Sequence, residues 1–111
     1  MDTRLKYQKL IKDILLEHTK YKPAFGEIAP RVLFDDEHES YALLDIGWDG
    51  NEYVHGAVIH VELIKDKIWI QYDGTEEGIA TDLLEAGIPK EHIVLGFRPP
   101  ELRSYTGFAV A

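Results

Sequence analysis

Two short turns, each between runs of alternating residues, constrain the fold of this chain more than any other feature. Residues 49–51 (Asp-Gly-Asn) are types that adopt the left-handed conformations of a tight β-hairpin, and residues 65–66 (Lys-Asp) are predicted to make a second short turn. The turns separate three strand-like segments, which are Ser40 to Trp48, Glu52 to Ile64 and Lys67 to Asp73. The pattern therefore predicts an antiparallel meander.

Pairing around the two turns assigns each side chain to a face of this meander, because faces alternate along a strand. Around residues 65–66 the predicted pairs are Leu63 with Ile68, Val61 with Ile70, and Ile59 with Tyr72. Around residues 49–51 the same face receives Ala42, Leu44, Ile46, Trp48, Tyr53, His55 and Ala57. Both hairpins thus predict one apolar face, and His55 is interpreted as a hydrogen-bonded core histidine.

The opposite face of the predicted sheet mixes aromatic, aliphatic and polar residues. Its members are Tyr41, Leu43, Val54, Val58, His60, Glu62, Trp69 and Gln71. Such a mixture is typical of the core of a protein interface. The alternative is that the second helix or the tail covers this face within one subunit, and both interpretations stay open.

The segment before the meander predicts a helix followed by a short strand. From Asp2 to Tyr21 apolar residues recur every three or four positions, and the proline after Lys22 ends the helical pattern. Residues 24–30 are a predicted linker, and Arg31 to Phe34 a predicted short strand. The apolar stripe of the helix is the natural cover for the apolar sheet face.

The segment after the meander predicts a second, short helix. It opens at residues 74–77 with Asp73 or Thr75 as cap, and Gly87 and Pro89 end it. Residues 93–95 form a short buried strand or turn, and an irregular tail ends in the apolar residues 108–111. We expect this tail, including Phe108, to dock on its own domain or on a partner subunit.

These elements predict an α+β fold in one domain spanning residues 1–111. An N-terminal amphipathic helix packs on a mainly antiparallel meander sheet of about four strands, and a second short helix and an irregular C-terminal tail follow.

Charge and composition exclude several classes of function. Twelve Lys and Arg against twenty Asp and Glu give a net charge of −8, which repels a phosphate backbone, so direct nucleic-acid binding is not expected. The absence of cysteine excludes disulfides and Cys-ligated zinc. We expect a cytoplasmic protein without a membrane segment, and no sequence motif calls for a cofactor.

Two patterns suggest catalysis, and neither is complete. Residues 72–75 (Tyr-Asp-Gly-Thr) are similar to the loop of phosphoryl-transferring aspartate enzymes, but Gln71 stands where those enzymes need a nucleophilic carboxylate. His60 and Glu62 share a face and, with Asp45 or Asp73, form a candidate divalent-metal site of a small hydrolase or nuclease. A small-ligand pocket between sheet and tail is a further alternative. The residues alone therefore predict no enzyme.

Segments along the whole chain carry a resemblance to a known family. They are residues 7–11 (Tyr-Gln-Lys-Leu-Ile), 44–48 (Leu-Asp-Ile-Gly-Trp), 56–60, 67–76, 78–80, 88–94 and 94–97 (Val-Leu-Gly-Phe). In these segments the chain resembles the XisI family, the fdxN element excision controlling factors. The run from Trp69 to Glu76, followed by residues 88–94, is the most distinctive part.

The resemblance implies a small α+β protein of filamentous cyanobacteria associated with programmed excision of a DNA element. It implies action beside a site-specific recombinase and a companion protein, XisH, and it carries no catalytic residues onto this chain. Combined with the charge of −8, it suggests an accessory factor that acts through protein contacts as a homodimer or higher homo-oligomer. The predicted contact residues are Tyr41, Trp69, His60 and Glu62 on the mixed face and Phe108 in the tail.

Overall fold

The structure, a computed structural model, describes residues 3–20 and 26–111. Its elements follow the chain in this order: α1 (Thr3–His18), β1 (Glu27–Asp35), β2 (Ser40–Asp49), β3 (Glu52–Ile64), β4 (Lys67–Asp73), α2 (Ile79–Glu85), the 3-10 helix η1 (Lys90–His92), β5 (Ile93–Leu95) and the 3-10 helix η2 (Pro100–Tyr105). The predicted α+β fold is confirmed.

The strands form one sheet in the order β1-β2-β3-β4-β5. β1 to β4 pair as an antiparallel meander, and β5 adds a parallel strand beside β4. The sheet therefore has five strands where about four were predicted, because the short apolar segment 93–95 is a strand. The tail continues alongside β5 through a bridge between Val94 and Ala109.

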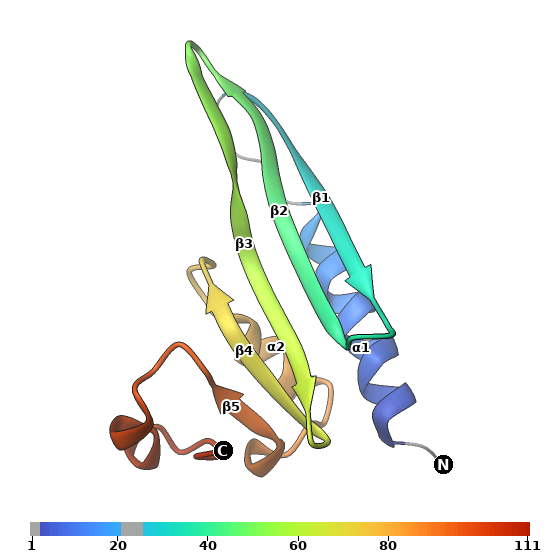
Figure 1. Cartoon of the computed structure of the whole chain (residues 1–111), viewed down its shortest axis with the longest axis vertical. Helices are drawn as coiled ribbons and strands as arrows, with labels where there is room; N and C mark the ends of the chain where they lie inside the picture. Colours follow the sequence, from blue (N-terminus) through green and yellow to red (C-terminus); the bar gives the residue numbers. More distant parts are fainter. Residues whose placement is uncertain (1–2, 21–25) are drawn as a thin grey trace.

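The core lies between one face of the sheet and the two α-helices, which Figure 1 shows behind the strands. Tyr7, Ile11 and Leu15 form the buried stripe of α1, at the spacing of three to four residues that one helix face requires. Ile79 and Leu83 are the buried residues of α2. The sheet contributes buried Tyr41, Leu43, Ile59, Val61, Leu63, Ile68 and Ile70.

Two β-bulges overturn part of the predicted face assignment. Near the turn at residues 49–51 the predicted grouping on one face is correct, since Trp48 pairs with Tyr53 and Leu44 with Ala57. Val58 is then an extra residue, because Leu43 pairs with Ile59. An extra residue shifts the alternation of side chains along β3 by one position. Ala57 therefore points to the outer face, whereas Ile59 points to the core.

The consequences for individual side chains are large. Tyr41 and Leu43, predicted on the mixed face, are buried in the core. Their neighbours Ala42 and Leu44, with Ile46, Trp48 and Ala57, lie on the outer face of the sheet. His55 is exposed, so its prediction as a core histidine is wrong. A second bulge in β4 pairs Tyr72 with His60 in place of Ile59 and leaves Tyr72 50% exposed.

Three predicted boundaries also change. β1 begins at Glu27, four residues before the predicted Arg31, and it tolerates Pro30 because β1 is an edge strand. The described part of the first helix ends at His18, and residues 21–25, the end of the predicted helix and the start of the linker, lie outside the described residues. The second helix begins only at Ile79, so residues 74–77 form a loop.

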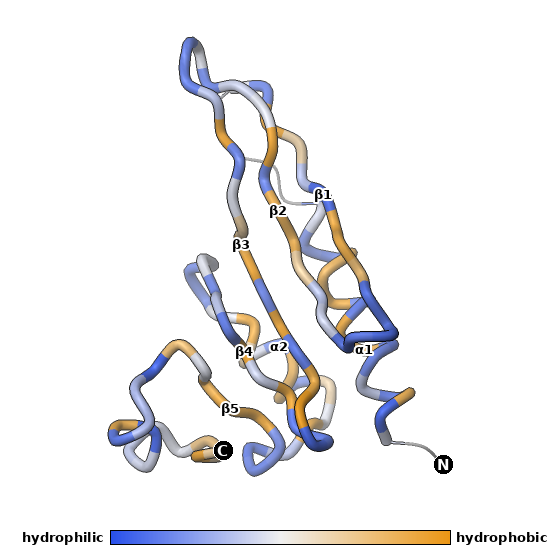
Figure 2. Tube along the Cα trace, in the orientation of Figure 1, coloured by the Kyte–Doolittle hydropathy of each residue, from blue (hydrophilic) through white to orange (hydrophobic). Residues whose placement is uncertain are grey.

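The β2–β3 hairpin and the start of β1 extend beyond the helices as an arm (Figure 1). The molecule measures 44 × 32 × 24 Å, with a radius of gyration of 14.6 Å. A compact chain of this length has a radius of gyration of about 13 Å. Figure 2 shows apolar and polar residues alternating along β2 and β3, with a hydrophilic tip at their turn.

None of the described helices is both long and apolar enough to cross a membrane.

Candidate functional site

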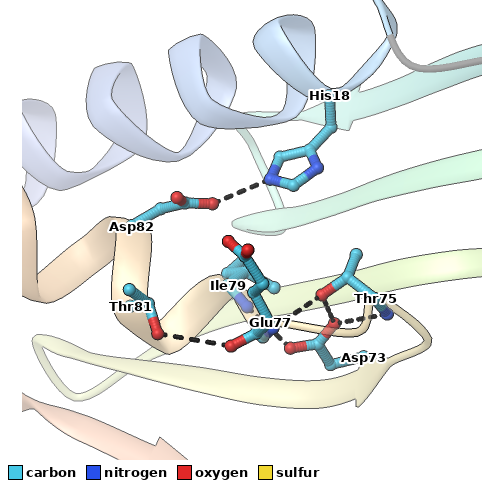
Figure 3. A network of polar contacts seen from close by, with 8 residues as sticks. His18, Asp73, Thr75, Glu77, Ile79, Thr81 and Asp82 are labelled. Atoms are coloured by element: carbon cyan, nitrogen blue, oxygen red, sulfur yellow. Dashed lines mark hydrogen bonds and ion pairs between the residues drawn. The ribbon is translucent and has the colours of Figure 1, made fainter.

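Asp73, at the end of β4, organises the loop that leads into α2. Its Oδ1 accepts hydrogen bonds from the Thr75 backbone N–H at 3.0 Å and the Thr75 hydroxyl at 2.6 Å. Its Oδ2 accepts from the Ile79 N–H at 2.7 Å, and the Gly78 N–H donates to Thr75 Oγ1 at 3.1 Å. Figure 3 shows the resulting network. The predicted cap residue, Asp73 or Thr75, is wrong, because the helix starts later than predicted and its N-cap residue is Gly78. Asp73 still accepts a hydrogen bond from the first N–H of α2, that of Ile79.

This loop forms one wall of a cleft, and the last turn of α1 forms the other. The cleft has a volume of about 580 Å³. The residues that line it are Ile14, Glu17, His18, Thr75, Glu76, Glu77, Gly78, Asp82 and Glu85. We call it the acidic cleft, because among the described residues that line it five carry carboxylates and none is Lys or Arg.

Within residues 3–20 and 26–111, His18 is the one basic side chain that lines the acidic cleft. Its Nε2 lies 2.7 Å from Asp82 Oδ2, which joins α1 to α2 across the cleft (Figure 3). Glu17 Oε2 accepts from Lys20 Nζ at 3.0 Å. The carboxylates of Glu76, Glu77 and Glu85 make the cleft a surface for a cationic group. Charge complementarity of this kind steers association and selects partners.

Sequence reasoning missed the acidic cleft. A signal was present, because residues 74–89 hold four acidic residues and no basic one. The other wall comes from α1, however, and His18 and Asp82 are 64 positions apart. Only the folded chain brings these two segments together.

The outer face of the sheet carries a second, shallower depression, which we call the outer groove. It has a volume of about 600 Å³ and is lined by Leu33, Phe34, Asp35, Ser40, Ala42, Leu44, Ala57 and His60. His60 Nε2 lies 3.0 Å from Ser40 Oγ. Beside it, Gln71 Nε2 donates to Glu62 Oε1 at 3.0 Å. The structure therefore brings His60 and Glu62 to the predicted mixed face.

Trp69 is on this outer face, and the C-terminal segment covers it. The Arg103 guanidinium lies over the Trp69 ring, 5.1 Å from its centroid. A Cβ on Gly96 would lie 3.1 Å from Trp69 Cε3, so the backbone approaches the ring closely. Phe108 packs against the core of its own chain. The tail therefore docks on its own domain, as one of the two predicted alternatives stated.

Tyr41, one of the predicted contact residues, does not lie on the outer face. Its side chain is 0% exposed, and its hydroxyl donates to Asp36 Oδ1 at 2.8 Å. Burial, followed by this hydrogen bond to a carboxylate, raises the pKa of Tyr41 well above its ordinary value. Lys12 Nζ donates to the other oxygen of Asp36, and both hydrogen bonds lower the pKa of Asp36. Tyr41 is therefore a core residue that anchors a turn.

The structure does not assemble the candidate metal site. Asp73 is engaged by Thr75 and Ile79 on the helix side of the sheet. Asp45 follows Leu44 on β2, and successive side chains of a strand point to opposite faces. Ala42 and Leu44 share the outer face with His60 and Glu62, so Asp45 points to the opposite face. Burial raises the pKa of Asp45. Within residues 3–20 and 26–111 no three His, Asp or Glu side chains are grouped so that they could hold one ion.

Comparisons with known proteins agree on one family. The family model described as XisI protein matches residues 1–110. A crystal structure of a XisI-like protein from Anabaena variabilis is similar with a TM-score of 0.90 and 32% identity, over 97% of this chain and 99% of that one. A crystal structure of the fdxN element excision controlling factor XisI from the same organism is similar with a TM-score of 0.84 and 32% identity, over 99% and 100% of the two chains. No curated protein matches this chain in sequence.

Proposed function

Because the chain belongs to the XisI family, we propose that it is an accessory factor in the controlled excision of a DNA element, and that it acts through contacts with other proteins. The similar structure of the fdxN element excision controlling factor supports the role in excision. The acidic cleft supports the mode of action, because a surface lined by carboxylates favours a cationic partner and disfavours DNA.

The partner in this proposal is a basic surface on a DNA-binding protein of the same system. A site-specific recombinase or an XisH-like companion fits this description, since proteins that bind DNA carry clusters of Lys and Arg. The cleft offers Glu76, Glu77 and Glu85 to such a cluster. In this arrangement the partner contacts the DNA, and the chain described here regulates the partner without catalysis of its own.

The outer face is a second contact region in the proposal. His60 lines the outer groove, and Glu62 and Trp69 lie beside it. Phe108 contributes by holding the tail against the core. This region is less acidic than the cleft, so it suits contacts that do not depend on charge, including contacts between copies in a homo-oligomer.

Co-purification with the protein encoded beside it tests the proposal, followed by light scattering of the complex. We expect a stable complex whose affinity falls about tenfold or more in the double variant Glu76→Lys, Glu77→Lys. The matched control is Glu91→Lys, Glu101→Lys, which changes the charge equally at exposed positions outside the cleft. The control is expected to bind like the original chain.

Three results contradict parts of the proposal separately. Equal affinity of both double variants excludes the acidic cleft as the contact surface. Failure to form any complex with the recombinase or the companion removes the role through protein contacts. A shift of a DNA fragment by the purified chain alone at physiological salt, with a steep salt dependence, shows direct DNA binding and overturns the assignment of DNA contacts to the partner.

A further inference from the structure

The part of β3 that lies in the arm is an open sheet edge. β4 pairs with β3 only from Ile59 to Ile64, and beyond this the Gly74 N–H donates to the Val58 carbonyl at 2.7 Å. Within the described residues, 52–57 of β3 pair with β2 on one side and with no strand on the other. Figure 1 shows this part of β3 standing clear of β4 and of the C-terminal segment.

The turn geometry determines which residues present backbone groups at this edge. Asp49 and Glu52 flank a two-residue turn, and such a flanking pair exchanges backbone hydrogen bonds. Hydrogen-bonded and non-hydrogen-bonded pairs alternate along an antiparallel ladder. Tyr53, His55 and Ala57 therefore direct their N–H and C=O groups away from β2.

The open edge lacks the features that usually prevent strand pairing. Edge strands are commonly protected by proline, lysine or a covering segment. β1, at one side of the sheet, carries Pro30 followed by Arg31. Residues 53–57 of β3 carry neither proline nor a charged Lys, Arg, Asp or Glu, and Tyr53 is 53% exposed.

We propose that two copies of this chain associate by antiparallel pairing of residues 52–56 of β3 across a twofold axis at Val54. Antiparallel pairing of one segment with itself uses the same surface on both copies and closes as a dimer. Two copies that each carry a charge of −8 must keep their carboxylates apart. In this register Glu52 falls opposite Gly56 of the second copy, and no two acidic residues face each other.

Residues at and next to the open edge favour the register with its axis at Val54 over the neighbouring one. An axis at Val54 places Tyr53 opposite His55 of the second copy, and the two such pairs form four backbone hydrogen bonds. The Tyr53 and His55 rings already stack within one chain, with centroids 6.3 Å apart. An axis at His55 would instead bring Glu52 of the second copy opposite Val58, where Gly74 already occupies the edge.

Cysteine cross-linking tests the register directly, because the chain contains no cysteine. At a non-hydrogen-bonded pair on the axis the two Cα atoms are about 4.5 Å apart, within the range of a disulfide. We expect Val54→Cys to form a disulfide-linked dimer under mild oxidation. The control Leu5→Cys, at an exposed position on α1 outside both proposed contact regions, is expected to stay uncross-linked.

Light scattering gives the second test. The original chain is expected at twice its mass of 12.7 kDa. His55→Pro removes an N–H that points away from β2, so it is expected to give a monomer with an unchanged circular dichroism spectrum. A monomeric original chain at about 100 μM, a folded His55→Pro dimer, or cross-linking of Leu5→Cys as fast as Val54→Cys each overturns the proposal. If His55→Pro fails to fold, the two cysteine variants decide, and none of these results depends on the acidic cleft.

Discussion

The Tyr7 hydroxyl of α1 lies 2.6 Å from Nδ1 of His92 in η1, so a hydrogen bond joins segments that are 85 residues apart in the chain. Burial raises the pKa of Tyr7, which keeps its hydroxyl protonated and able to donate. The two rings also pack at a centroid distance of 6.0 Å. This contact connects α1 to the segment that carries β5.

Removing the hydroxyl in Tyr7→Phe is expected to lower the free energy of unfolding by about 1 kcal/mol, the usual value of one such hydrogen bond. Urea denaturation measures the change. A double-mutant cycle with His92→Ala isolates the pair, and a coupling energy near zero would show that the bond contributes nothing to stability.

The bulge at Val58 predicts opposite outcomes for two adjacent leucines. Leu43 is 3% exposed in the core, whereas Leu44 lies on the outer face. Leu43→Ala is therefore expected to lower the free energy of unfolding by about 2–5 kcal/mol, and Leu44→Ala by less than about 1 kcal/mol. Denaturation of both variants measures this. A larger loss of stability in Leu44→Ala than in Leu43→Ala would contradict the bulge at Val58 and support pairing without it.

The hydrogen bonds to Asp73 predict that its removal destabilises the start of α2. Its carboxylate accepts from Thr75 and from the Ile79 N–H. Asp73→Ala is expected to lower the free energy of unfolding by about 1–3 kcal/mol, because it leaves the N–H groups that donate to this carboxylate without their partner. Hydrogen exchange of the Ile79 amide should accelerate. Glu77→Ala, which changes the same loop without removing this carboxylate, is the control, and equal acceleration in both variants would deny Asp73 this role.

The hydrogen bonds that Asp36 accepts predict that the stability of the fold depends on pH. Hydrogen bonds from Lys12 and Tyr41 lower its pKa below the ordinary value. A carboxyl with a lowered pKa in the folded state contributes stability above its unfolded pKa of about 4, and this contribution is lost as the pH falls through the folded pKa. In Asp36→Asn the decline of stability below about pH 4 is expected to be shallower.

Denaturation at a series of pH values checks this prediction. Asp13→Asn serves as the control, because Asp13 is an exposed carboxylate on α1 paired only with Lys9 across one helical turn. A pH profile of Asp36→Asn that coincides with that of the original chain would contradict the predicted linkage.

Local patterns in the sequence predicted most elements of the fold. The turns at residues 49–51 and 65–66, the strands between them and the stripe of α1 all appear where residue types and spacing place them. Pairs close to the turn at residues 65–66 were also predicted, such as Leu63 with Ile68 and Val61 with Ile70. A short turn determines the register of its nearest neighbours, because little chain lies between them.

The candidate sites were predictable only in part. His60 and Glu62 reach the outer face as alternation predicts, while the acidic cleft depends on residues from α1 and α2 that are far apart in sequence. Tyr41 was assigned to the wrong face, because no residue type marks Val58 as the extra residue of a bulge. Val58 carries an ordinary strand-forming side chain.

The sequence by itself determined the properties that depend on neighbouring residues or on sums over the chain. These are the turns, the amphipathic helix, the charge of −8 and the absence of cysteine. The tertiary structure alone decided which face of the sheet is buried, how α1 and α2 enclose the acidic cleft, and that part of β3 is left as an open edge. The physical reason is that one extra residue in a strand reverses the faces beyond it, and that contacts between distant segments form only when the whole core packs.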